Sequence, residues 1–239
     1  MRVLPTICAV ALSTSVELGT GSAARAQAPI ADPAQSARLR MVETQLRSRG
    51  ISNPAVLQAM SRVPRHMFVP ADLKPFAYDD RPLPIGRGQT ISQPYIVAYM
   101  TEALQVRPEH TVLEVGTGSA YQAAVLAELA RQVYTIEIIP DLAEQARRSL
   151  RDMGYRNVEV RSGNGYFGWA EHAPFARIIV TAAPPEIPKA LIDQLAVGGM
   201  MVLPVGSGLQ EIVIVTKGAG GVTQQKTIPV RFVPMVGKP

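Results

Sequence analysis

The chain is nearly without cysteine and poor in histidine. Its 239 residues include one cysteine, Cys8, which excludes a disulfide framework, a cysteine-ligated metal site and a Cys-x-x-Cys redox motif. The three histidines, His66, His110 and His172, lie far apart without the spacing of a metal site, so no metal is expected. Beyond the N-terminus there is no uninterrupted run of about 20 apolar residues, so we expect no stable membrane insertion.

Charged residues are also scarce, at 18%, against 47% hydrophobic residues. A disordered chain has the opposite composition, so a folded protein is indicated. The formal net charge of +5 could suit nucleic acid, but the basic residues are scattered. Their densest group, Arg147, Arg148 and Arg151, recurs at helical spacing beside acidic residues, which is typical of a solvated helix face. No nucleic-acid partner is therefore expected.

The N-terminus has the features of a secretory signal peptide. Arg2 supplies a positive charge, residues 3–12 are mostly apolar, and small residues in an A-x-A pattern end at Ala26. We therefore predict a signal peptide over residues 1–26, followed by a proline-containing linker over 27–35. The alternative is an N-terminus that is disordered or that begins at the wrong start codon.

The next region, residues 36–107, is predicted to be a helical extension. Apolar residues recur at helical spacing from Ser36 until Gly50, and Asn53 followed by proline is typical of a helix start. Another helix is expected over Pro94–Leu104. Between these helices, repeated prolines up to Thr90 indicate irregular structure.

Residues 108–239 alternate between strand and helix patterns, which predicts an α/β core with a parallel sheet covered on both faces. The expected strands are Val112–Val115, Val133–Ile138, Val158–Arg161, Arg177–Thr181, Met200–Pro204, Ile212–Thr216 and Val230–Val233. The expected helices are Ser119–Arg131, Pro140–Met153 and Ile187–Leu195.

A glycine loop follows the first of these strands. The run Glu114-Val115-Gly116-Thr117-Gly118-Ser119-Ala120 leads from strand into helix, and glycines there let a ligand approach the helix N-terminus. The next strand reaches Glu137, 21 positions after the first glycine, where a carboxylate can accept hydrogen bonds from ribose hydroxyls. We therefore expect a nucleoside-containing cofactor, bound by Gly116, Thr117, Gly118, Ser119 and Glu137.

The loop resembles that of class I S-adenosylmethionine-dependent methyltransferases more than that of NAD-binding domains. It has the form E-x-G-x-G, and Tyr121 stands where the dinucleotide fingerprint has its third glycine. The carboxylate of Glu114 would repel a pyrophosphate, whereas S-adenosyl-L-methionine carries an amine and no pyrophosphate. S-adenosyl-L-methionine is thus the expected cofactor, and the resemblance implies that Glu114 and Glu137 are the acidic residues that bind it.

Several segments together resemble the protein-L-isoaspartate (D-aspartate) O-methyltransferase family. They are Val63–Pro70 (VPRHMFVP), Leu83–Pro94 (LPIGRGQTISQP), Val112–Gln122, Ile178–Pro184 and Val230–Pro234. The resemblance covers nearly everything after the signal segment. It implies a Rossmann-like class I methyltransferase fold, with a mostly parallel seven-stranded sheet and an N-terminal helical extension.

The resemblance also implies roles for particular residues. The catalytic serine of the family falls on Ser92, within a substrate-binding segment that comprises Thr90, Ile91, Ser92 and Gln93. An Asp-Gly pair that contacts the adenine in the family is Asn164-Gly165 here. An asparagine can still accept a hydrogen bond from the adenine amino group, but as a neutral acceptor.

Two further positions depart from the family pattern. Ala120 stands where the family usually has glycine, and Ala176 where an aspartate commonly precedes the fourth strand. These departures concern the affinity for the cofactor more than the type of reaction.

The implied activity is methyl transfer from S-adenosyl-L-methionine to the α-carboxylate of L-isoaspartyl and D-aspartyl residues in damaged proteins or peptides, which initiates repair. Such a carboxylate is already ionised at neutral pH, so neither a metal nor a general base is needed. One alternative is an O-methyltransferase of a small carboxylic acid. Another is a catalytically weak, exported relative that only binds the cofactor.

The expected partners are isoaspartyl proteins and peptides, and the chain is expected to be a monomer. The family implies a cytoplasmic protein, because S-adenosyl-L-methionine is made in the cytosol and is charged. The alternative is a periplasmic protein, exported by a signal peptide that is cleaved near Ala26.

Overall fold

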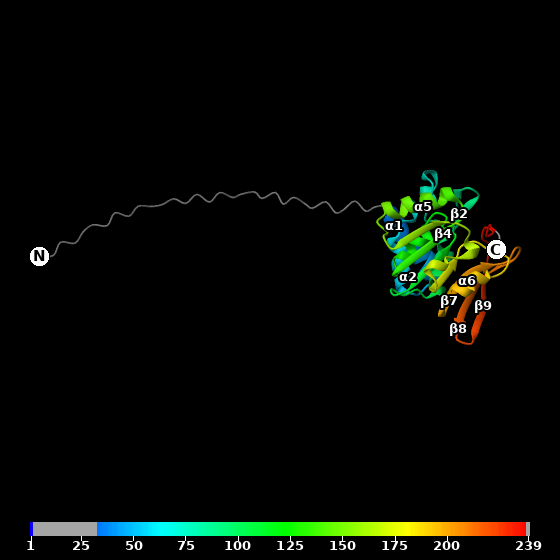
Figure 1. Ribbon diagram of the computed structural model, residues 1–239. Coiled ribbons are helices and arrows are strands. Elements are labelled where there is room, and N and C mark those ends of the chain that lie inside the picture. The colour runs from blue at the N-terminus through cyan, green and yellow to red at the C-terminus, as the bar shows by residue number, and fades with distance from the viewer. Residues whose placement is uncertain (2–32, 238–239) are drawn as a thin grey trace. The chain divides into compact units, whose positions relative to one another are not determined.

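The computed structural model describes Met1 and residues 33–237 of the chain (Figure 1). The expected signal peptide and residues 27–32 of the expected linker therefore lie outside the described residues, apart from Met1. The first helix begins at Pro33, so the last three residues of that linker are helical. The helical extension and the α/β core belong to one structural unit.

The core is a seven-stranded sheet in the order β5-β4-β3-β6-β7-β8-β9. Its strands are β3 (Thr111–Val115), β4 (Gln132–Glu137), β5 (Val158–Ser162), β6 (Phe175–Val180), β7 (Leu195–Val205), β8 (Gln210–Gly218) and β9 (Gly221–Val230). The strands from β3 to β7 run parallel, whereas β8 and β9 are antiparallel to their neighbours. The predicted mostly parallel seven-stranded sheet is confirmed.

Side chains alternate between two buried faces along the central strands. In β3, Leu113 and Val115 pack into the cluster that also contains Phe175 and Leu191, whereas Val112 packs into the cluster on the opposite face. Both faces are therefore covered, which explains why the central strands are almost entirely apolar.

The α-helices are α1 (Pro33–Met41), α2 (Pro54–Arg62), α3 (Pro94–Leu104), α4 (Tyr121–Ala127), α5 (Pro140–Asp152) and α6 (Lys189–Gln194), and α1 continues into a short π-helix over Val42–Leu46. The predicted start of α2 is confirmed, because the Asn53 side chain accepts hydrogen bonds from the N–H groups of Ala55 (2.9 Å) and Val56 (3.3 Å). In Figure 1, the N-terminal helices α1 and α2 lie at the left of the folded part of the chain, and the strands β8 and β9 lie at its lower right. No helix in the described part of the chain is long and apolar enough to cross a membrane.

The extension and the core share one apolar cluster. Buried residues of the extension, such as Leu46 and Met60, pack with Tyr121 and Val125 of α4 and Leu150 of α5. The extension is thus fixed to the helices that follow the glycine loop.

Several predicted elements differ from the structure; β7, for example, begins at Leu195 and not at Met200, and α6 is shorter than the predicted Ile187–Leu195. The proline-rich region contains a small antiparallel hairpin, β1 (Leu83–Gly86) and β2 (Gln89–Ile91), which pairs Leu83 with Ile91. The last strand is Gly221–Val230 and not Val230–Val233. The sequence did not reveal it because this edge strand is exposed on both sides and shows no apolar alternation. Helix α4 is also shorter than the predicted Ser119–Arg131.

The strand order changes direction at β3. The chain first builds β4 and β5 on one side of β3 and then places β6 and β7 on the other. In open α/β sheets, ligands bind at such a switch point, outside the carboxyl ends of the strands. The residues after β3, β4 and β6 are therefore the place to look for a site.

Candidate active site

The glycine loop lies at the carboxyl end of β3. Gly116 has a φ of +99° and Gly118 a φ of +51°, a region that side chains other than glycine rarely adopt. A Cβ at Gly116 would also collide with the Thr181 hydroxyl, which donates to the carbonyl oxygens of Gly116 (2.5 Å) and Val115 (3.2 Å). Thr181 thus ties the loop to the end of β6, and position 116 has to be glycine.

Ala120, the N-cap residue that precedes α4, has a φ of +72°, in the left-handed region. This explains why the family usually has glycine at this position, since an alanine there is strained. The backbone of the loop nevertheless keeps the glycine-like conformation.

Glu137 ends β4 beside the loop. Its carboxylate accepts hydrogen bonds from the N–H groups of Gly118 (2.7 Å) and Ile139 (3.0 Å), so it holds both the loop and the chain after β4. Each carboxylate oxygen can accept a second hydrogen bond. Glu137 also lines a cavity at the carboxyl ends of β3, β4 and β6.

Glu114 lies beneath the loop and not in the wall of this cavity. It is fully buried, and its Oε2 accepts a hydrogen bond of 2.5 Å from Thr135, whose hydroxyl lies 2.6 Å from that of Thr117. Burial raises the pKa of Glu114 to about 8, and the negative charge of Glu137 adds to this shift. The Glu114 side chain is therefore connected to the loop through the hydroxyl groups of Thr135 and Thr117.

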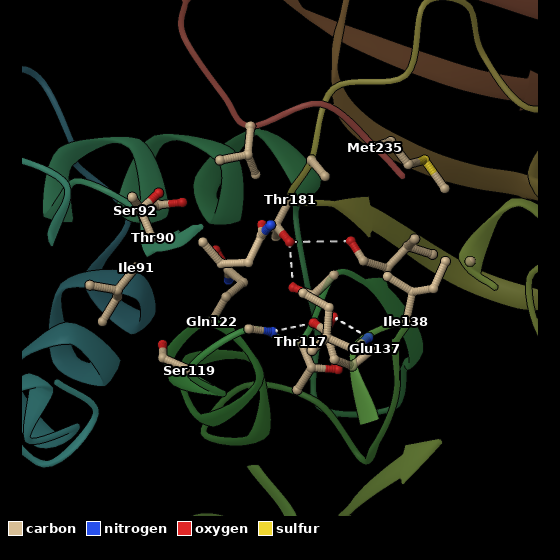
Figure 2. A pocket seen from close by; sticks show the side chains of 18 of the residues that line it. Thr90, Ile91, Ser92, Thr117, Ser119, Gln122, Glu137, Ile138, Thr181 and Met235 are labelled. Atoms are coloured by element: carbon tan, nitrogen blue, oxygen red, sulfur yellow. Dashed lines mark hydrogen bonds between the residues drawn. The ribbon is translucent and has the colours of Figure 1, made fainter. Parts of the chain in front are cut away.

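The cavity is lined by most of the residues that the sequence predicted. Figure 2 shows Thr90, Ile91 and Ser92 on one side of it and Glu137 on the other. Its remaining polar and glycine lining is Gln89, Gly116, Thr117, Gly118, Ser119, Gln122, Gly165 and Thr181. Among the described residues that line it, Glu137 has the only charged side chain.

Gly165 approaches the cavity from the end of β5. A Cβ on Gly165 would collide with Val115, so the backbone comes closer to β3 than any other residue would allow. The neighbouring Asn164 does not line the cavity; its Oδ1 accepts a hydrogen bond from the N–H of Tyr166 (3.0 Å) and caps the short turn there. Of the Asn164-Gly165 pair, Gly165 lines the cavity and Asn164 does not.

A second cavity adjoins the first at Ser92. Thr90, Ser92, Thr181 and Val233 line both of them, whereas Gln93 lines only the second. The other walls of the second cavity are Pro82, Ile96, Pro229, Val230, Arg231 and Phe232. Arg231 has the only charged side chain among the described residues that line it, so the two cavities carry opposite charges and meet at Ser92.

Sequence reasoning missed several contributors, among them Gln89 and Gln122 beside the predicted segments. Thr181 was not among the predicted site residues, although it follows the strand next to β3. The C-terminal segment also lines the first cavity, because Val233 and Met235 exchange backbone hydrogen bonds with Ala183 (2.9 and 2.8 Å). This contact joins segments about 50 residues apart, which no local pattern indicates. Among the described residues, no group of three or more potential metal ligands occurs.

The sheet order, the glycine loop and the acidic residue that ends β4 define a class I methyltransferase of the S-adenosylmethionine-dependent type. The model of the Protein-L-isoaspartate(D-aspartate) O-methyltransferase family matches residues 37–239. The chain therefore belongs to that family.

Relatives and solved structures agree with this assignment. The chain is 60% identical over 213 residues to the protein-L-isoaspartate O-methyltransferase of Synechococcus sp. (strain JA-2-3B'a(2-13)), which covers 86% of this chain and 87% of the relative. It is 59% identical over 197 residues to that of Gloeobacter violaceus, covering 82% of this chain and 96% of the relative.

A solved protein-L-isoaspartate O-methyltransferase superposes with a TM-score of 0.76 at 27% identity, covering 84% of this chain and 66% of that one. A Plasmodium falciparum structure, described as a family member in complex with S-adenosyl-L-homocysteine, shares the fold with a TM-score of 0.73 at 24% identity, covering 83% and 98% of the two chains.

Proposed function

We propose that the chain methylates the α-carboxylate of L-isoaspartyl and D-aspartyl residues in damaged proteins and peptides, with S-adenosyl-L-methionine as the methyl donor. The observation that carries this proposal is the pair of adjoining cavities, one with the single negative charge of Glu137 and one with the single positive charge of Arg231. A cationic sulfonium suits the first, and a carboxylate substrate suits the second.

The first cavity fits the cofactor. The tight approach of Gly116 and Gly165 leaves room for a ligand against bare backbone, and Glu137 can accept from ribose hydroxyls. A dinucleotide fits less well, because Tyr121 stands where the dinucleotide fingerprint has the third glycine that allows close helix–strand packing. When bound, S-adenosyl-L-methionine supplies an electrophilic methyl group.

The second cavity would hold the substrate carboxylate, which is the nucleophile. It is ionised at neutral pH, so the protein has no proton to remove and its task is alignment. The Ser92 hydroxyl, at the junction of the cavities, would donate a hydrogen bond to one carboxylate oxygen and leave the other free to attack. Arg231 would attract the carboxylate into the cavity.

The test is Ser92→Ala in the purified protein. The loss of one donor to a charged group is worth about 1.5–3 kcal/mol, or roughly 10- to 150-fold in kcat/KM. The affinity for S-adenosyl-L-homocysteine should stay the same, since the hydroxyl faces the substrate. Unchanged kcat/KM would remove Ser92 from the mechanism, and methylation of small carboxylic acids but not of isoaspartyl peptides would favour the alternative activity.

We also propose that the protein is cytoplasmic, because its cofactor is made in the cytosol and is too polar to cross a membrane unaided. We further propose that it is a monomer. Fractionation of cells that express a tagged chain, together with N-terminal sequencing and light scattering, tests both points. A periplasmic product that starts near Gln27, or the mass of a dimer, would contradict them.

A further inference from the structure

Ser92 lies in a short connection between two anchored elements. On one side, Ile91 is buried and ends β2, which is paired with β1. On the other side, Pro94 begins α3. The connection itself, Ser92-Gln93, lies in no helix or strand, so its position depends on what holds the start of α3.

Asp80 holds the start of α3 from a distant part of the extension. Its Oδ1 accepts from the N–H of Tyr95 (3.4 Å), one of the helix-terminal donors that the helix itself cannot satisfy. Its backbone oxygen accepts from the side-chain amide of Gln93 (3.1 Å). The N-cap residue of α3, Gln93, makes no capping hydrogen bond with its own side chain. Asp80 thus contacts the residues on both sides of Pro94.

Arg49 fixes the carboxylate of Asp80. Its guanidinium donates to Oδ2 of Asp80 (2.5 Å) and lies 3.6 Å from the centre of the Tyr95 ring. Arg49, Asp80 and Tyr95 therefore contact one another in a closed triangle. The negative charge at a helix N-terminus is also favourable in itself.

We propose that Asp80, oriented by Arg49, is a positioning residue that holds Ser92 at the junction of the two cavities. This inference rests on the proposed role of Ser92 in aligning the substrate carboxylate. Loss of the Asp80 carboxylate would leave the N–H of Tyr95 and the Arg49 guanidinium without their acceptor, although the backbone oxygen at position 80 would still accept from Gln93. The first turn of α3 would then be held less firmly, and the Ser92 hydroxyl would shift from the line of attack. A misplacement of about 1 Å in such an alignment can cost up to about 100-fold in rate.

The test is a double-mutant cycle of Asp80→Ala and Ser92→Ala. We expect Asp80→Ala to lower kcat/KM for an isoaspartyl peptide about tenfold or more, with an unchanged dissociation constant for S-adenosyl-L-homocysteine. If Asp80 acts through Ser92, the double variant should match Ser92→Ala within about twofold, because residues that act as a unit are not additive.

Two further variants separate positioning from folding. Asp80→Asn keeps an oxygen for the N–H of Tyr95, so it should restore most of the activity that Asp80→Ala loses. Asp79→Ala is the matched control, because Asp79 lies in the same turn but pairs only with the exposed Arg81 (3.2 Å) among the described residues. It should leave kcat/KM within about twofold of the wild type.

The outcomes are distinguishable. Losses that multiply in the double variant, or an Asp80→Ala enzyme with full activity, would overturn the inference while the role of Ser92 stands. A fully active Ser92→Ala enzyme would overturn the proposed role of Ser92 first. Weakened binding of S-adenosyl-L-homocysteine by Asp80→Ala would show a general structural role and would also overturn the inference.

Discussion

Replacement of Glu114 by glutamine should change how the stability of the protein depends on pH. Glu114 is fully buried, its Oε2 has Thr135 as partner, and its Oε1 has none among the described residues. Burial, with a smaller contribution from the charge of Glu137, raises its pKa from 4.5 to about 8. The ionised form is therefore costly in the folded protein.

The direction in which the free energy of unfolding changes with pH follows from the number of protons bound in each state. Between pH 4.5 and about 8, the folded state keeps the proton on Glu114 and the unfolded state has lost it. Stability falls as pH rises wherever the folded state binds more protons, at about 1.4 kcal/mol per pH unit for one group. From pH 5 to pH 8 this amounts to a loss on the order of 4 kcal/mol at most. Below pH 4.5 Glu114 causes no loss of stability, and above about pH 8 the loss no longer grows with pH.

Glu114→Gln removes this cost and keeps an oxygen that can accept from Thr135. The free energy of unfolding, measured by urea titration without ligand at several pH values, should fall from pH 5 to pH 8 more steeply in the wild type than in the variant. Glu159→Gln, on an exposed position of β5, is the control and should follow the wild-type curve. Parallel curves for the wild type and Glu114→Gln would refute the reasoning.

Three further variants test the two cavities. Glu137→Ala should weaken the binding of S-adenosyl-L-methionine and S-adenosyl-L-homocysteine alike, by calorimetry, because both present the same ribose and the Gly118 N–H loses its acceptor; retained affinity for both would exclude Glu137 as the ribose acceptor. Asn164→Asp should keep or improve that affinity, since a carboxylate still accepts from Tyr166 and is the family residue; a marked loss would mean that the site is adapted to asparagine. Arg231→Gln should raise KM for an isoaspartyl peptide several-fold without changing cofactor affinity, and an unchanged KM would remove Arg231 from substrate recognition.

The fold, the family and the reaction class were predictable because their signals are local. The glycine loop stands between a strand and a helix, and the structure places it with Glu137 at the carboxyl ends of two adjacent strands. Asn53 followed by Pro54 marked the start of α2 for the same reason. Parallel strands then bring these ends to one edge of the sheet without further information.

Contacts between distant segments were not predictable from such signals. The C-terminal segment reaches the first cavity through one bridge between Ala183 and Pro234. The hairpin β1–β2 was hidden by Pro82 and Pro84, which indicated irregular structure. In an antiparallel pair at the surface, prolines are tolerated on the edge, so they do not exclude a strand.

The position of Glu114 could have been predicted from alternation within β3. Residues two apart along a strand share a face, so Glu114 shares its face with Val112. That face packs against helices, as the cluster of Val112 with Leu104 shows. The side chain therefore points into the packed layer beneath the loop, where it accepts a hydrogen bond from Thr135.

The most direct test of the proposed activity is transfer of a labelled methyl group from S-adenosyl-L-methionine by the purified chain. Two peptides of identical sequence would be offered, one with an L-isoaspartyl residue and one with a normal aspartyl residue at the same position. The account predicts a methyl ester on the isoaspartyl peptide and none above background on the aspartyl peptide. Equal labelling of both peptides, or none on the isoaspartyl peptide by a chain that binds S-adenosyl-L-homocysteine, would contradict it.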